Sequence, residues 1–121
     1  MNDLEVVVAG GGNAALCAAI TAREKGASVT LFESAPSNMR GGNTRHTRNL
    51  RASHIGPLET LEESYSEDEF WDDILKVTQG NTDEKLTHLM IKQSSSLMSW
   101  LKERDVHFQP ALSGTLSLHR T

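Results

Sequence analysis

The chain has 121 residues, a length that suits one small domain and is too short for two ordinary ones. Its net charge of −4 gives no electrostatic footprint for nucleic acid or anionic lipid, and its 37% hydrophobic content is typical of a folded, soluble segment. The single cysteine excludes an internal disulfide, and the sequence shows neither a secretory signal nor an apolar run long enough to span a bilayer. We therefore expect a cytoplasmic protein that meets a membrane only through a partner.

The first thirty residues predict a β-α-β unit. The run Leu4–Ala9 predicts a strand buried on both faces, because its β-branched residues follow one another without alternation. An alanine-rich helix is expected over Asn13–Lys25, where Gly26 supplies the stop, and a second strand over Ser28–Glu33. The predicted fold class is α/β, the start of a parallel sheet of the Rossmann-like kind, followed by a helical segment.

The second half of the chain predicts two helices. Ser66 and Glu69 form a capping box that opens a helix to about Thr78, with Gly80 ending it, and a second helix is expected over 82–104. Residues 50–65 have no clear pattern. Apolar residues at helical spacing predict the buried stripes: Phe70, Trp71, Ile74 and Val77, then Leu86, Leu89, Met90, Leu97, Trp100 and Leu101.

Other features of this half are expected to be less regular or solvated. Short extended segments are expected over 106–108 and 112–118. The acidic run that includes Asp68, Asp72 and Asp73 is interpreted as a solvated helix face.

A dinucleotide fingerprint lies between the first strand and the first helix. Gly10 to Ala15 has the form G-x-G-x-x-A, in which Gly10 permits a tight turn, Gly12 lets a pyrophosphate approach, and Ala15 allows close packing. The helix N-terminus then offers N–H groups to the phosphates. Glu33 follows 23 residues after Gly10, where a carboxylate can accept hydrogen bonds from ribose hydroxyls and would repel the 2′-phosphate of NADP. This pattern leaves FAD and NAD both open.

The segment after the second strand favours FAD. In a simple NAD domain a short connection would follow, whereas Ser34–Asn49 is expected to be a long polar loop. Gly41 and Gly42 allow close approach to a ligand, and Arg40, Arg45 and Arg48 can neutralise phosphate or favour an anionic reduced flavin.

The strings VVVAGGGNAALCAAITAREKGASVTLFESAP and RGGNTRHTRNLR resemble the flavoprotein subunits of the fumarate reductase/succinate dehydrogenase family, including its members that oxidise tricarballylate to cis-aconitate. GGNTRHTRN is the more specific part of the likeness. The resemblance implies a partial FAD-binding fold whose cofactor contacts come from these residues: Gly10, Gly11, Gly12, Asn13, Ala14, Ala15, Glu33, Arg40, Gly41, Gly42, Asn43 and Thr44.

The same resemblance bears on how FAD is attached. Membrane-bound members of the family bond FAD to a histidine in a Ser-His-Thr string, and the best alignment puts Asn43 at that position, so FAD is expected to be non-covalent. A two-residue shift of the loop would bring His46 there instead and reopen covalent attachment.

The resemblance further implies the reaction and its missing parts. FAD would accept a hydride from a di- or tricarboxylate such as tricarballylate, a partner protein would reoxidise it, and no metal would take part. Residues 1–50 would form the β-α-β unit and flavin loop, and residues 51–121 a helical extension toward an absent capping domain that holds the catalytic groups. We therefore expect a fragment that binds FAD weakly and turns over nothing alone.

Two alternatives remain from the residues themselves. An NAD-binding dehydrogenase domain would explain Gly10 to Glu33 but gives the loop of residues 41–49 no role. A non-catalytic nucleotide-binding module, with the two later helices as a docking surface, would show dimerisation without nucleotide.

Overall fold

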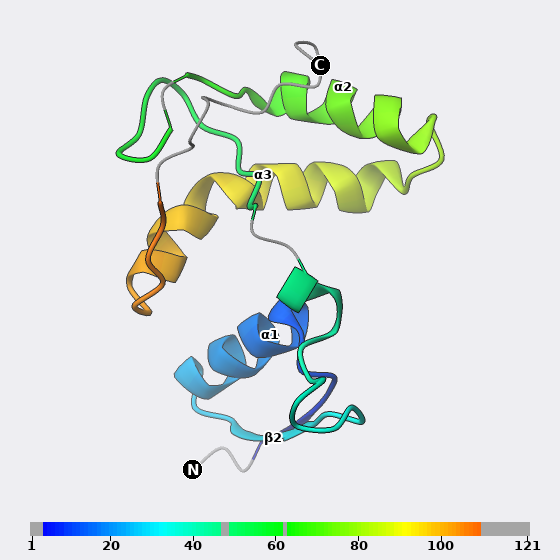
Figure 1. Cartoon of the computed structure of the whole chain (residues 1–121), viewed down its shortest axis with the longest axis vertical. Coiled ribbons are helices and arrows are strands. Elements are labelled where there is room, and N and C mark those ends of the chain that lie inside the picture. Colours follow the sequence, from blue (N-terminus) through cyan, green and yellow to red (C-terminus); the bar gives the residue numbers. More distant parts are fainter. Residues whose placement is uncertain (1–3, 47–48, 62, 110–121) are drawn as a thin grey trace. The chain divides into compact units, whose positions relative to one another are not determined.

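The computed structural model describes residues 4–46, 49–61 and 63–109. The chain divides into two compact units, Met1–Asn49 and Leu50–Thr121, which are described in turn (Figure 1).

The first unit is a β-α-β motif. Strand β1 (Glu5–Ala9) and strand β2 (Ser28–Phe32) pair in parallel, with Glu5 opposite Ser28 and Ala9 opposite Phe32. Helix α1 (Asn13–Glu24) connects them and contacts both strands. The α/β prediction is confirmed, and the boundaries of these three elements agree with the expected ones to within one residue.

The strand β1 is not buried on both faces, contrary to the prediction. Val6 and Val8 are half-buried together with Val29, whereas Val7 on the opposite face is 63% exposed and Phe32 is 62% exposed. The physical reason is that α1 can cover one face of a two-stranded sheet only, so side chains alternate between a covered and an open face. A run of valines does not reveal how many layers surround a strand.

The polar loop after β2 contains a short helix that the sequence did not predict. A 3₁₀ helix, η1 (Gly42–His46), interrupts the expected irregular stretch. Gly41 and Gly42 precede and open it with φ of +103° and +53°, a region that side-chain-bearing residues rarely adopt. The two glycines therefore reverse the chain so that the loop turns back.

The second unit contains two helices that lie side by side, α2 (Glu67–Thr78) and α3 (Glu84–Lys102) (Figure 1). Ser66 caps α2 by accepting the Glu69 N–H at 3.1 Å, as the capping box predicted, and α2 ends at Gln79, which is left-handed with φ 55°. Asp83 caps α3 by accepting the Leu86 N–H at 2.9 Å, so this helix begins two residues later than expected.

The predicted apolar stripes are partly wrong. Phe70 is buried with Tyr65 and Ile91, and Trp71 and Ile74 pack against them, but Val77 is exposed. On α3 the expected residues Leu86, Leu89 and Met90 are exposed, and the helix buries instead Thr87, Ile91 and Ser94.

The segment before α2 explains why α3 buries Ser94. The Ser53 N–H donates to Ser94 Oγ at 2.9 Å, and the Ser53 and Ser94 hydroxyls both lie within hydrogen-bond distance of the Ile91 carbonyl oxygen. Tyr65 and His54 pair as an antiparallel bridge beside these contacts. Because hydrogen bonds satisfy the buried hydroxyls, the segment can pack on this face of α3.

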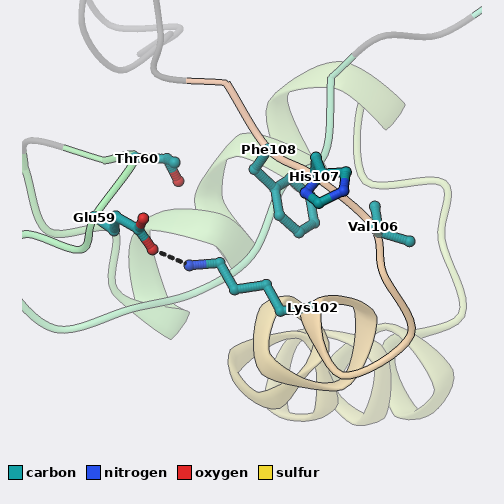
Figure 2. Close-up of a pocket in the computed structure, with 6 residues that line it drawn as sticks. All are labelled: Glu59, Thr60, Lys102, Val106, His107 and Phe108. Carbon is teal, nitrogen blue, oxygen red and sulfur yellow. Dashed lines mark hydrogen bonds and ion pairs between the residues drawn. The ribbon is translucent and has the colours of Figure 1, made fainter.

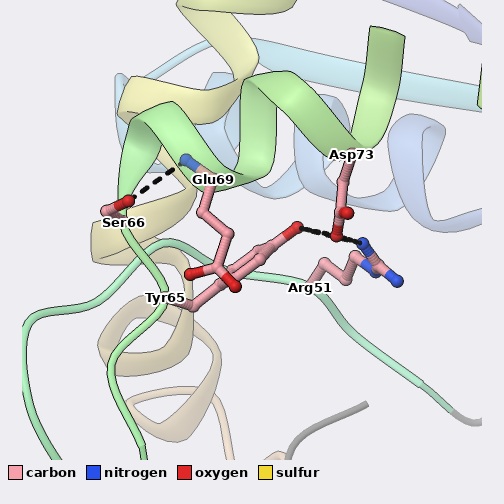
Figure 3. A network of polar contacts seen from close by, with 5 residues as sticks. All are labelled: Arg51, Tyr65, Ser66, Glu69 and Asp73. Carbon is pink, nitrogen blue, oxygen red and sulfur yellow. Dashed lines mark hydrogen bonds and ion pairs between the residues drawn. The ribbon is translucent and has the colours of Figure 1, made fainter. Parts of the chain in front are cut away.

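Asp73 contradicts the prediction of a solvated acidic face. It is 2% exposed, and its Oδ2 accepts hydrogen bonds from Arg51 at 2.6 Å and from the Tyr65 hydroxyl at 2.8 Å (Figure 3). Charge alone predicted exposure, but a guanidinium and a phenol at Oδ2 offset part of the cost of burying this carboxylate. Its Oδ1 is buried without a hydrogen-bond partner among the described residues. The expected extended segment 106–108 has no regular structure, and 112–118 lies outside the described residues.

Candidate functional site

The first glycine turn, Gly10 to Gly12, follows the carboxyl end of β1 and is hydrogen-bonded to the carboxyl end of β2. Gly10 has a φ of +115°, and its N–H donates to the Phe32 carbonyl oxygen at 2.7 Å. Gly12 is the N-cap of α1 and provides no side-chain cap. The turn therefore brings the first residues of α1 to the edge of the sheet where β2 ends.

Glu33 lies directly against Gly11. A β-carbon on Gly11 would come within 2.7 Å of Glu33 Oε2 and 3.3 Å of its Cγ, so the Glu33 side chain would have to shift. The sequence analysis assigned Gly10 to the tight turn and Gly12 to the approach of a pyrophosphate, but it missed this contact of Gly11. The G-x-G-x-x-A pattern gives no signal for it, since Gly11 stands at a position where any residue is allowed.

The second glycine loop, residues 36–46 with Gly41 and Gly42, approaches the same turn. The Asn13 N–H, at the start of α1, donates to Thr44 Oγ1 at 3.0 Å. A β-carbon on Gly12 would lie 3.3 Å from Thr44 Oγ1 and 3.4 Å from the Gly41 carbonyl oxygen. Two glycine-containing segments 31 residues apart thus meet at the N-terminus of α1.

The Glu33 carboxylate is held ionised. The Ala35 N–H donates to Oε1 at 2.9 Å and the Gly41 N–H to Oε2 at 3.5 Å, and these backbone donors, with Ala35 first, lower the pKa of Glu33 below 4.5. The N–H groups of Gly11 and Ser34 lower the pKa of Glu33 further, so the carboxylate lies among backbone donors.

A hollow of about 500 Å³ opens beside this carboxylate. Leu16 and Leu31 give it apolar walls, and its remaining lining residues are Gly11, Glu33, Arg40 and Gly41. The mixture of apolar walls, one carboxylate and one guanidinium is typical of a small-molecule site.

The other residues proposed from the sequence differ in how far they are exposed near this site. Ala15 is half-buried, with its Cβ 3.8 Å from the β-carbon position of Gly10, while Ala14, Gly42 and Asn43 are exposed. Arg45 donates to the Asn38 carbonyl oxygen at 2.6 Å and so braces its own loop. Arg48 lies outside the described residues.

The second unit contains a smaller hollow of about 250 Å³ (Figure 2). Its lining residues are Glu59, Thr60, Lys102, Val106, His107 and Phe108. Lys102 forms an ion pair with Glu59, so its charge is already neutralised there. Across the described part of the chain, no group of three or more histidine, cysteine or acidic residues is arranged to hold a metal. Within those same residues, no helix is long and apolar enough to cross a membrane.

A parallel β-α-β unit with a glycine turn, a terminal acid and a second glycine loop defines a nucleotide-binding domain of the Rossmann-like kind. The chain belongs to the FAD-binding domain family, whose profile matches residues 5–120 and so covers both units. The prediction of a partial FAD-binding fold is thereby confirmed.

The chain is also similar to one protein whose reaction is named. The chain is 29% identical over 119 residues to the NADH:fumarate oxidoreductase of Klebsiella pneumoniae (strain 342). This alignment covers 97% of the chain but only 13% of that protein, so the chain spans a small part of its relative's length. The chain is thus distantly homologous to a fumarate reductase-type flavoprotein. No solved structure matches it.

Proposed function

We propose that the first unit of this chain binds FAD non-covalently as part of an oxidoreductase that acts on the CH–CH bond of a small di- or tricarboxylate. The observation that carries the proposal is the meeting of Gly11, Gly12, Glu33 and Thr44 at the N-terminus of α1. The match to an FAD-binding family across residues 5–120 supports FAD over NAD.

The residues present fit a dinucleotide. A β-carbon at Gly11 would meet Glu33 and one at Gly12 would meet Thr44, so the glycines let these groups gather at the N-terminus of α1. Helix α1, unlike α2 and α3, has no acidic side chain in its first turn to repel phosphates. Glu33 would accept the hydroxyls of the adenosine ribose, and Arg40 would offer positive charge to the phosphates.

Bound FAD would supply the hydride acceptor of the reaction. The first unit would bind and orient it, with residues 42–44 on the flavin side. The substrate is proposed from two sources. The similar Klebsiella protein is named for fumarate, and the loop string resembles members of the family that oxidise tricarballylate. The groups that clamp the carboxylates and move the proton are proposed to lie outside these 121 residues, and a partner protein would reoxidise FAD.

Titration with FAD and with NAD tests the proposal. We expect quenching of flavin fluorescence with FAD, and no comparable binding of NAD, when the whole chain is used. Removing the charge by Glu33→Gln is expected to weaken FAD binding about tenfold, because a charged acceptor bonds the ribose hydroxyls more strongly than a neutral amide. Tighter binding of NAD than of FAD would contradict the proposal.

A matched control and an attachment assay complete the test. Glu5→Gln removes an equivalent charge from the exposed start of β1 and should leave the affinity unchanged. After denaturation of the FAD-loaded chain, the yellow colour should separate from the polypeptide. Colour that stays with the chain would place a covalent bond in the loop, with His46 as the residue to examine.

A further inference from the structure

We propose that Thr44 is a positioning residue that fastens the second glycine loop onto the N-terminus of α1 before any nucleotide binds. The functional part of this inference, that the fastening prepares the cradle for FAD, rests on the function proposed above. The structural part stands on the contacts of the chain itself.

Thr44 does the work of an N-cap from a distance. Helices α2 and α3 are capped by the residue that immediately precedes each of them, Ser66 and Asp83. Gly12 precedes α1 and has no side chain to offer, and the hydrogen bond to the Asn13 N–H comes instead from Thr44 Oγ1 at 3.0 Å. Capping of the first helix and placement of the loop are therefore one and the same contact.

The close fit around Gly12 supports this assignment. The position of a Gly12 β-carbon lies 3.3 Å from Thr44 Oγ1 and 3.4 Å from the Gly41 carbonyl oxygen, tighter than most side-chain contacts. The absence of a side chain at Gly12 thus leaves room for Thr44 and Gly41 of the second loop, in addition to the room that a ligand would need. In the first glycine motif, Gly11 makes room for Glu33 and Gly12 makes room for the second loop.

Among the described residues, two hydrogen bonds tie residues 36–46 to the rest of the first unit, and the bond to Thr44 is the shorter. The other is the Gly41 N–H to Glu33 Oε2, which at 3.5 Å is at the outer limit of a hydrogen bond. Among the described residues Arg45 donates to the Asn38 carbonyl oxygen and the Met39 sulfur, both within residues 36–46, and so stiffens the loop without anchoring it. Loss of the Thr44 hydroxyl should therefore free the whole loop from the N-terminus of α1.

The tie does not have to break when a nucleotide binds. A threonine hydroxyl has one donor and two acceptor sites, and the Asn13 N–H uses one acceptor. Among the described residues the Thr44 hydroxyl has no acceptor for its own hydrogen. The loop can therefore stay fastened while the hydroxyl group faces an anion, so the ordering of residues 41–46 is complete before binding and does not weaken it.

The test compares Thr44→Val, which keeps the side-chain shape and removes the hydroxyl, with Thr44→Ser, which keeps the hydroxyl. Thr30→Val, at an exposed position of β2, is the matched control. In the chain without nucleotide, the valine variant should exchange the Asn13 amide hydrogen about fivefold faster, the usual effect of a lost cap. Trypsin should also cleave faster after Arg40 and Arg45, and serine should restore both rates.

FAD titration of the same variants separates the two proposals. We expect the valine variant to bind FAD about fivefold more weakly than the wild type, and the serine variant to match the wild type. Unchanged exchange and cleavage in the valine variant would overturn the fastening role, whatever FAD does. Faster exchange and cleavage with unaltered FAD affinity would overturn its preparation of the cradle. Failure of the wild-type chain to bind FAD would overturn the proposed function and leave the fastening role supported by exchange and cleavage alone.

Discussion

The three glycines of the first turn lack a side chain for different physical reasons. Gly10 needs its freedom for a φ of +115°, while Gly11 is limited by the Glu33 carboxylate and Gly12 by Thr44 and Gly41. A substitution at Gly11 meets mainly the far end of a flexible side chain, which can move aside. Its cost should therefore appear in ligand binding more than in folding.

Gly11→Ala tests this distinction. The free energy of unfolding should change by less than about 1 kcal/mol, as for surface substitutions that a side chain can accommodate. The affinity for FAD should fall because the displaced Glu33 carboxylate would no longer face the position proposed for the ribose. In a Glu33→Ala background the same glycine substitution should have almost no further effect on affinity, because the carboxylate that it displaces is already absent. Equal losses in both backgrounds would show that Gly11 acts independently of Glu33.

At the scale of elements, the α2–α3 pair depends on a different face of α3 than its hydrophobic pattern suggests. Ile91 is 1% exposed and joins Tyr65 and Phe70 in the core, whereas Leu89, two residues earlier, is exposed. The buried hydroxyls of Ser53 and Ser94 lie next to Ile91 and fix the segment before α2 on this face.

Alanine substitutions at these two positions measure which face is packed. Ile91→Ala should lower the free energy of unfolding by about 2–5 kcal/mol, the range for deleting a buried aliphatic side chain. Leu89→Ala should change it by less than about 1 kcal/mol in the isolated chain. Chemical denaturation followed by tryptophan fluorescence gives both values. A larger loss at Leu89 than at Ile91 would mean that the exposed face is covered in solution.

At the scale of the whole molecule, spectroscopic probes separate the two units. The chain's two tryptophans, Trp71 and Trp100, and its one tyrosine, Tyr65, all belong to the unit Leu50–Thr121. Their signals therefore report the helical unit, while a flavin bound at the proposed site would report the β-α-β unit. Burial and then the hydrogen bond to Asp73 raise the pKa of Tyr65 from 10.0 to about 12.

The raised pKa predicts an alkaline weakness of the helical unit. Because the folded pKa lies above the unfolded one, the stability that Tyr65 contributes is complete below about pH 10 and is lost as the pH rises through about 12. Denaturation at a series of pH values should show this decline together with the appearance of phenolate absorbance. Tyr65→Phe should be less stable at neutral pH but should depend less on pH between these limits. An equal decline in both proteins would assign the effect to other groups.

The chain's local chemistry determined much of this protein. The order of strand, glycine turn, alanine-rich helix and second strand fixed the β-α-β unit, and Ser66 with Glu69 fixed the start of α2, because propensities, turns and caps act over a few neighbouring residues. The match to an FAD-binding family agrees with the interpretation of that local pattern.

The tertiary structure decided which side chains meet. Neither the burial of Asp73 beside Arg51 nor the contact of Gly11 with Glu33 could be read from spacing, since each joins residues 22 positions apart. Thr44 reaches α1 across 31 positions, and Ser53 reaches Ser94 of α3 across 41. Periodicity tells which residues share a face, but only the packing of distant segments determines which face is covered and which polar groups find partners.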